Sequence, residues 1–329
     1  MEELGRKLHD WSKGERKLRD RRFEDLNGGL RELGDCDISE AVLEEITRVK
    51  IEMNLEADKE EIYWEQRARA NWLKIGDRNT AFFHRSASHR RKKNLVKELE
   101  DEFGNLKTEA EEISRMATNY FKDIFSSNGV GDCNSLLESF QPSITEELNR
   151  DLRAEFTADE IISAIKPIAP LKASGIDGFS TIFYQKYWHI VGKKITKFCL
   201  ETLNGEREMK EVNFTSIVLI PKINSPKLMS QFRPISLCNV IYKIISKVLV
   251  NRFRKVLNFY IEDTQGAFIS GRQITDNIFV AYEILHSFKK RRGTSNKGFA
   301  LKFDMSKAYD RVEWIFLKNM MSRMGFCNE

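Results

Sequence analysis

The sequence predicts an α+β fold in which helices dominate. Many stretches repeat apolar residues every three or four positions, as amphipathic helices do. Only short runs, such as 217–220 and 299–303, have the β-branched and apolar composition of strands. With 329 residues, the chain is long enough for two domains or for one domain with extensions.

The charge of the chain is more informative in its distribution than in its total. The sequence has 54 Lys and Arg against 49 Asp and Glu, a net charge of only +5. Basic residues cluster at 85–93 and at 289–292. Such clusters bind phosphates in nucleic-acid-binding proteins, but they also occur as solvated helix ends, and the sequence leaves both interpretations open.

The five cysteines are widely scattered, and no pair has the spacing of a zinc or redox motif. This favours a reducing, intracellular location, in the cytoplasm or the nucleus. The N-terminus lacks the apolar core of a signal peptide, and no run of residues is long and apolar enough to predict a membrane span. We therefore expect a protein without membrane contacts.

Residues 1–75 are predicted to be a helical linker region. Glycines within 27–29 and at Gly34 are expected to interrupt any helix in the first part. A long helix is predicted from Ser39, which is a suitable N-cap. Its apolar stripe consists of Val42, Ile46, Val49, Met53, Ala57, Trp64, Ala68 and Trp72.

Residues 76–125 are predicted to form a basic helix, a hairpin and a second helix. Gly76 and Asp77 are expected to separate the long helix from a basic one. The basic helix leads to four candidate nucleic-acid-binding residues, Arg90, Arg91, Lys92 and Lys93. A hairpin over 96–106 follows, and then a helix that Thr108 and Glu111 are expected to cap.

Residues 126–156 are predicted to be a linker, because 126–135 is polar and contains glycine.

In the last segment, 157–329, Thr157 and Glu160 form a capping box before a helix. A tight turn is predicted at 171–179, where Lys172 contacts a phosphate or is simply solvated.

Three further helices are predicted after this turn. The first begins at Ser180 and breaks near Gly192. The second begins at Ser236, and the third is capped by Thr275 or Asp276.

The segment 299–312 has the pattern on which the functional prediction depends. An apolar run is predicted to form a buried strand that ends at Asp304, and an amphipathic stretch follows it. A carboxylate at the end of a strand is a suitable ligand for Mg²⁺, which prefers oxygen ligands. The alternative is that this aspartate is the N-cap of the next helix.

Four motifs in a fixed order give the sequence a family resemblance. They are 215–222 (TSIVLIPK), 232–237 (FRPISL), 264–272 (TQGAFISGR) and 304–312 (DMSKAYDRV). Together they resemble the fingers and the first palm motif of reverse transcriptases, with the LINE-type non-LTR retrotransposons of plants as the closest family. The loop at 171–179 is similar to that family's, but Ser174 and Ile176 replace its two prolines.

This resemblance implies RNA-templated DNA synthesis with Mg²⁺, a DNA primer and dNTPs. Asp304 would be the catalytic metal ligand. Tyr309 would lie under the sugar of the dNTP and exclude a ribose hydroxyl, although a core tyrosine is the alternative. Arg233 would bind the triphosphate, with Lys222 as a weaker candidate. For Arg272, nucleic-acid binding and a role in turn formation remain equally open.

The resemblance also implies that a second carboxylate motif is needed. The family has an adjacent Asp-Asp pair after the Tyr309 region, and no such pair occurs in this sequence. One carboxylate cannot hold two ions about 3.5–4 Å apart. We therefore expect a truncated reverse transcriptase fragment that is inactive by itself. The alternative is a non-catalytic nucleic-acid-binding or assembly protein derived from one. The sequence does not predict an oligomeric state.

Overall fold

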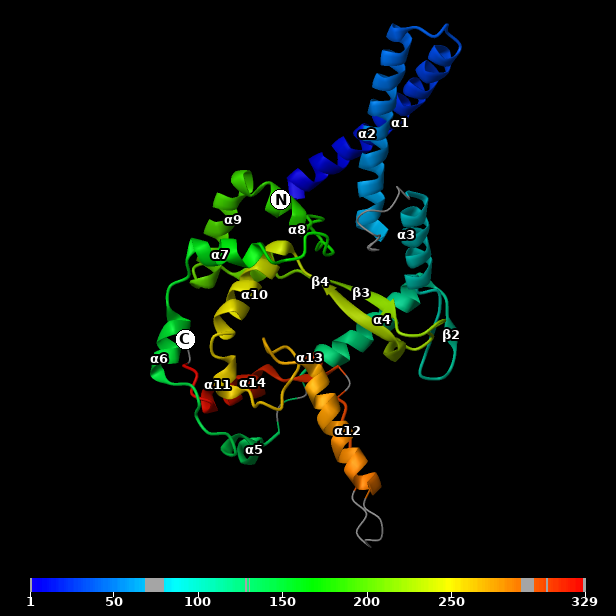
Figure 1. Cartoon of the computed structure of the whole chain (residues 1–329). Coiled ribbons are helices and arrows are strands. Elements are labelled where there is room, and N and C mark those ends of the chain that lie inside the picture. Colours follow the sequence, from blue (N-terminus) through cyan, green and yellow to red (C-terminus); the bar gives the residue numbers. More distant parts are fainter. Residues whose placement is uncertain are drawn as a thin grey trace. The chain divides into compact units, whose positions relative to one another are not determined.

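The computed structural model describes residues 2–68, 80–127, 129, 131–290, 299–305 and 307–327. Helices dominate it, and its few strands are short, which confirms the predicted fold class (Figure 1). The chain divides into two compact units. Unit 1 contains Met1–Thr108, Ile168–Lys193 and Met209–Tyr242, and unit 2 contains Glu109–Pro167, Lys194–Glu208 and Lys243–Glu329.

Unit 1 begins with two long helices. Helix α1 (Glu2–Gly34) and helix α2 (Glu40–Ala68) contact each other, and the later part of α1 runs beside α2 (Figure 1). The predicted interruption at Gly28 and Gly29 was wrong, since α1 continues through both and ends at Gly34. A helical glycine costs only about 1 kcal/mol relative to alanine, and packing against α2 offsets this cost. The Ser39 cap is confirmed, because its Oγ accepts a hydrogen bond of 3.3 Å from the Val42 amide.

Helix α3 (Thr80–Asn94) follows, as predicted. Its His84 ring lies 4.4 Å from the Trp64 ring of α2 in an edge-on arrangement, so Trp64 packs within the protein. Trp72, Gly76 and Asp77 lie outside the described residues. The predicted hairpin is confirmed as the antiparallel pair of β1 (Leu99–Glu100) and β2 (Leu106–Lys107).

A second hairpin in unit 1 pairs β3 (Ser216–Pro221) with β4 (Phe232–Leu237) in antiparallel register, from Ser216 opposite Leu237 to Pro221 opposite Phe232. Two short 3₁₀ turns, η1 (Met209–Glu211) and η2 (Met229–Gln231), precede the strands. The prediction that a helix begins at Ser236 was wrong: Ser236 pairs with Ile217, and α10 begins only at Val240. Cross-strand hydrogen bonds to β3 overrode the local helical pattern.

The helical region after Ser180 consists of α8 (Thr181–Lys186) and α9 (Trp188–Leu203). The break lies at Tyr187, so the predicted break at Gly192 was wrong. Gly192 has a packing role instead. A Cβ at this position would lie 2.7 Å from the Trp188 indole, so only glycine leaves room for that ring against the helix.

Unit 2 is mostly helical. Its elements are α4 (Ala110–Phe125), α5 (Asn134–Glu138), α6 (Glu146–Arg153), α7 (Ala158–Ile165), α9 from Lys194 onward, α10 (Val240–Phe253, from Lys243 onward), α11 (Leu257–Tyr260), α12 (Ile274–Lys290), α13 (Ala308–Arg311) and α14 (Trp314–Arg323). Residues buried in this unit include Ile161, Ile165, Ile244, Ile245 and Val248. Two helices, α5 and α6, lie within the segment 126–156.

Three predicted helix starts in unit 2 can be compared with the structure. The capping box of Thr157 and Glu160 is confirmed in both directions. The cap at Thr108 was wrong, because α4 has Glu109 as its N-cap and no side-chain cap bond. The caps at Thr275 and Asp276 were also wrong, since α12 already begins at Ile274. Such shifts of one or two residues are usual at helix ends.

All five cysteines carry free thiols. Burial in α9 raises the pKa of the Cys199 thiol to about 12, whereas Cys36 is exposed. None of the helices in the described ranges is both long and apolar enough to cross a membrane.

This difference in burial predicts selective alkylation. With iodoacetamide at pH 8, we expect Cys36 to react readily and Cys199 to remain unmodified until guanidinium chloride unfolds the chain, because only the thiolate reacts. Peptide mass spectrometry of the two forms measures this. Equal labelling of both thiols in the folded protein would contradict the burial of Cys199.

Candidate functional site

Asp304 lies in an exposed segment of unit 2, 299–305, that has no regular secondary structure. The predicted buried strand at 299–303 was wrong: these residues form no strand, and Phe299 and Phe303 are 84% and 85% exposed. The physical reason is pairing. Within the described residues, every strand belongs to one of the two hairpins, so this segment has no neighbour for its backbone hydrogen bonds. Asp304 is itself exposed.

Tyr309 belongs to the short helix α13. Lys307, the residue before this helix, has the left-handed backbone conformation (φ 55°, ψ 47°) that is uncommon for a lysine. Its Nζ donates a hydrogen bond of 2.6 Å to the Tyr120 hydroxyl of α4 and lies 4.1 Å from the centre of that ring. Tyr309 is 82% exposed and touches Phe268 edge-on at 6.1 Å, so the core-tyrosine alternative does not hold.

A cleft of about 1040 Å³ lies beside Tyr309 within unit 2. One wall comes from the end of α4 and the residues after it, including Tyr120, Asp123 and Phe125. The other wall is the segment 309–314 with Leu317. Tyr309 thus borders a space large enough for a small ligand.

Lys222 and Arg233 lie at the loop end of the β3–β4 hairpin in unit 1, and both are exposed. The hairpin brings them close together, since Arg233 is opposite Ile220 and the Lys222 amide donates to the Gln231 carbonyl at 2.8 Å. The Lys222 ammonium donates to the Ser230 carbonyl, also at 2.8 Å. A hairpin of this kind presents two cations on one rigid element.

Lys172 is exposed in the loop 171–179 of unit 1. The predicted tight turn is confirmed, since the Gly178 amide donates to the Gly175 carbonyl at 3.1 Å and Gly178 has a φ of +75°. Gly175 lies so close to Asn239 that a Cβ would fall 2.1 Å from the Asn239 Oδ1 and 2.6 Å from its backbone nitrogen. Glycine is therefore required here by space.

Arg272 is half-buried in unit 2, and its guanidinium donates to the loop that precedes it. It binds the carbonyls of Ile261, Glu262 and Gln265 and pairs with Asp263 at 3.1 Å. These contacts give Arg272 a clear role in holding the turn 261–265. The other basic candidates are exposed near the end of α3: Arg90 precedes the last turn, and Arg91, Lys92 and Lys93 lie in it.

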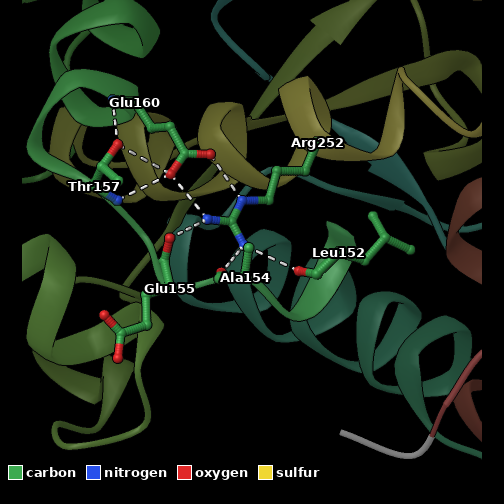
Figure 2. Close-up of polar contacts among 6 residues, drawn as sticks. All are labelled: Leu152, Ala154, Glu155, Thr157, Glu160 and Arg252. Carbon is green, nitrogen blue, oxygen red and sulfur yellow. Dashed lines mark hydrogen bonds and ion pairs between the residues drawn. The ribbon is translucent and has the colours of Figure 1, made fainter. Parts of the chain in front are cut away.

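Arg252 carries no functional prediction from the sequence, yet it makes the most polar contacts of any cation in the described part of unit 2. Its guanidinium donates hydrogen bonds to both carboxylate oxygens of Glu160, at 2.8 and 2.9 Å (Figure 2). It also donates to the carbonyls of Leu152, Ala154 and Glu155 and lies 3.6 Å above the Phe156 ring. The available signal was its position: Arg252 continues the buried stripe of Ile245 and Val248 at helical spacing.

Arg252 fixes the protonation state of its partner. Its hydrogen bonds are the largest cause that lowers the pKa of the Glu160 carboxyl to about 2, although burial opposes the shift. Glu160 also accepts from the Thr157 amide at 2.9 Å. One carboxylate thereby caps α7 and joins it to α10.

The acidic residues of the described ranges do not fit a two-ion magnesium site. No group of three or more His, Cys, Asp or Glu side chains converges there in a way that would hold a metal ion. Asp304 would supply one carboxylate and, by its backbone, Met305 one carbonyl oxygen. Two ions need several shared oxygen ligands, which Asp304 and Met305 alone do not supply.

Two comparisons relate the chain to known proteins. Residues 220–329 match the family model described as reverse transcriptase (RNA-dependent DNA polymerase). An uncharacterized 149 kDa protein of transposon TX1 from Xenopus laevis is 27% identical over 262 residues, which cover 79% of this chain and 20% of that protein. The chain thus spans about a fifth of the length of this curated relative. The resemblance to reverse transcriptases is confirmed for the matched segment.

Proposed function

We propose that the chain is part of a reverse transcriptase of a LINE-type non-LTR retrotransposon, of the kind found in plants. The match of residues 220–329 to the reverse transcriptase family carries this proposal. The transposon relative supports it, since its similarity reaches well beyond the matched segment. In this proposal 157–329 forms the fingers and the start of the palm, 126–156 is a linker, 76–125 extends the polymerase, and 1–75 is a helical linker region.

The proposed site residues divide by chemistry. Asp304 contributes a carboxylate toward Mg²⁺, and Tyr309 selects the deoxynucleotide by excluding a 2′-hydroxyl. Arg233 and Lys222 bind the triphosphate, a role that their exposed positions on one rigid hairpin support. The RNA template and DNA primer contact Arg90, Arg91, Lys92, Lys93 and Lys172. For Arg272, the contacts with its own loop favour a structural role.

We also propose that the 329-residue polypeptide does not polymerise DNA by itself. The support is the carboxylate count: the sequence has no adjacent Asp pair, and Asp304 is exposed without converging acids in the described ranges. A second candidate function is non-catalytic nucleic-acid binding or assembly, which the exposed basic turn at the end of α3 favours. Both functions place the protein inside the cell, in the cytoplasm or nucleus.

Primer extension separates these candidates. The 329-residue chain is incubated with a DNA primer annealed to an RNA template, Mg²⁺ and the four dNTPs, beside an RNA-binding titration at several salt concentrations. We expect no extension product. Extension that Asp304→Ala abolishes would contradict the proposed inactivity and show that Asp304 is catalytic. Salt-dependent binding without extension would favour the second candidate, and the absence of both would contradict it.

A further inference from the structure

The helices α1 and α2, which are predicted from the sequence as part of a linker region, enclose a groove lined by cations and aromatic side chains. The Arg16 guanidinium donates to the Tyr63 hydroxyl at 2.7 Å and lies 5.0 Å from the centre of that ring. Farther along the same pair of helices, Arg22 approaches Glu56. A surface pocket between these contacts is lined by side chains of both helices, and all of them belong to unit 1.

The groove lies in the most basic part of α1. Residues 6–22 contain eight Lys and Arg against three Asp and Glu, a net charge of +5, which equals the net charge of the whole chain. Arg16, Arg19 and Arg22 recur every three residues and line the groove from α1, and Lys59 lines it from α2. A row of cations at this spacing suits the phosphates of a nucleic-acid strand.

Glu56 holds two of these cations in place without neutralising the groove. Its side chain is only 8% exposed and accepts from Lys59 at 2.6 Å, and Arg22 lies 3.5 Å from it. The hydrogen bond from Lys59 is the largest cause that lowers the pKa of this carboxyl, so Glu56 is charged at neutral pH. The lining has four cations against the two acids Glu56 and Glu15, and it therefore attracts anions.

Aromatic side chains accompany the cations. Trp11 lines the groove and is 63% exposed, and Tyr63 lies on the opposite helix. An exposed indole beside a row of arginines is the combination with which proteins bind unpaired bases and the phosphates that connect them. A duplex would offer the phosphates but would keep its bases stacked away from the indole.

We propose that the groove between α1 and α2 binds single-stranded nucleic acid, with Arg19, Arg22 and Lys59 on the phosphates and Trp11 stacked on a base. The site is independent of the proposed polymerase site, and its test does not use DNA synthesis. RNA and DNA share the required chemistry, so labelled single strands of both are used, with duplex DNA for comparison.

The test measures fluorescence anisotropy of the full chain with 20-nucleotide probes over a range of KCl concentrations. Arg19→Gln is expected to weaken binding and to reduce the slope of log affinity against log salt by about 0.7, as expected for one lost phosphate contact on a single strand. Trp11→Ala is expected to weaken binding at least about fivefold with little change in slope, because stacking does not release counterions. Glu15→Gln, which removes an acid from the lining, is expected to tighten binding.

Matched controls lie on the same unit. Arg31→Gln changes the same residue type on α1 outside the groove, and Phe103→Ala removes an exposed ring at the tip of the β1–β2 hairpin. Both are expected to leave binding unchanged. Circular dichroism checks helicity in every variant.

Two independent results would overturn the proposal. The first is that Arg19→Gln and Trp11→Ala change the affinity and the salt slope no more than the control variants do. The second is that ultraviolet light cross-links single-stranded probes to the protein, but never to the tryptic peptide that contains Trp11. A difference between the RNA and DNA probes shows which of the two single strands the groove prefers. If Trp11→Ala weakens the binding of duplex DNA as much as that of the single strands, the stacking role of Trp11 would also be overturned.

Discussion

Arg252→Met is expected to lower the free energy of unfolding by about 3 kcal/mol, near the lower end of what is usual when one partner of a buried ion pair is removed. The substitution leaves the Glu160 carboxylate and three backbone carbonyls without their common donor. Part of the loss is recovered by water, because the Glu160 side chain is 30% exposed. Urea unfolding followed by circular dichroism measures the loss.

Two further variants show whether the geometry of the guanidinium matters. Arg252→Lys keeps the charge but has no planar fork, so we expect it to recover less than half of the lost stability. Arg254→Met, two positions farther along the chain and exposed, is expected to change stability by less than about 0.5 kcal/mol. Hydrogen exchange should become faster in α7, which Glu160 caps. Equal stability of the two methionine variants would refute the role of Arg252.

The same contact makes stability depend on pH in the acidic range. The pKa of Glu160 falls from 4.5 to about 2 on folding, so the unfolded chain binds this proton more readily than the folded one. The stabilisation is therefore complete above about pH 4.5 and is lost as the pH falls toward 2. The difference in stability between the wild type and Glu160→Gln should shrink over this interval. A constant difference from pH 6 to pH 2 would contradict the assignment.

Gly175→Ala is the second substitution with a large expected effect, a loss of about 3 kcal/mol from overpacking. The new Cβ would lie 2.1 Å from the Asn239 Oδ1, 2.6 Å from its backbone nitrogen and 2.8 Å from its Cα. Rotation of the Asn239 side chain relieves only the first of these contacts, so the backbone before α10 must move. The loop that carries Lys172 must move with it.

Thermal unfolding of matched glycine variants measures this effect. Gly131→Ala is the control, because a Cβ at that loop position meets no atom within 4 Å. We expect Gly175→Ala to lower the melting temperature by several degrees and Gly131→Ala to leave it nearly unchanged. Similar melting temperatures for both variants would show that the close approach of Gly175 to Asn239 does not constrain the fold.

Much of the local structure was predictable, because its hydrogen bonds join residues close in sequence. The Ser39 cap and the capping box of Thr157 and Glu160 each span three residues, and the structure contains both. The turn at Gly175 and Gly178 and the hairpin at 96–106 follow from equally local chemistry. The motifs that resemble reverse transcriptases were also readable, and the family comparison agrees with them for 220–329.

The candidate site was predictable only as a set of residue types. That Lys222 and Arg233 share one hairpin follows from the register of β3 and β4. No sequence signal predicted that Tyr309 is exposed. Nor did one predict that Lys307 donates a hydrogen bond to Tyr120, which lies 187 residues away in the sequence. The groove between α1 and α2 had no sequence signal, because only the fold brings Glu56, Lys59 and Tyr63 of α2 beside the basic stretch of α1.

The sequence by itself therefore determined where most helices form, how two of them are capped, and which family the motifs resemble. Only the tertiary structure decided that Ser236 belongs to a strand, that 299–303 does not form one, and that Arg252 is buried on Glu160. The physical reason is the range of the interactions. Helices and caps satisfy their polar groups within about four residues, whereas strands and buried charges need partners that the fold brings from distant parts of the chain.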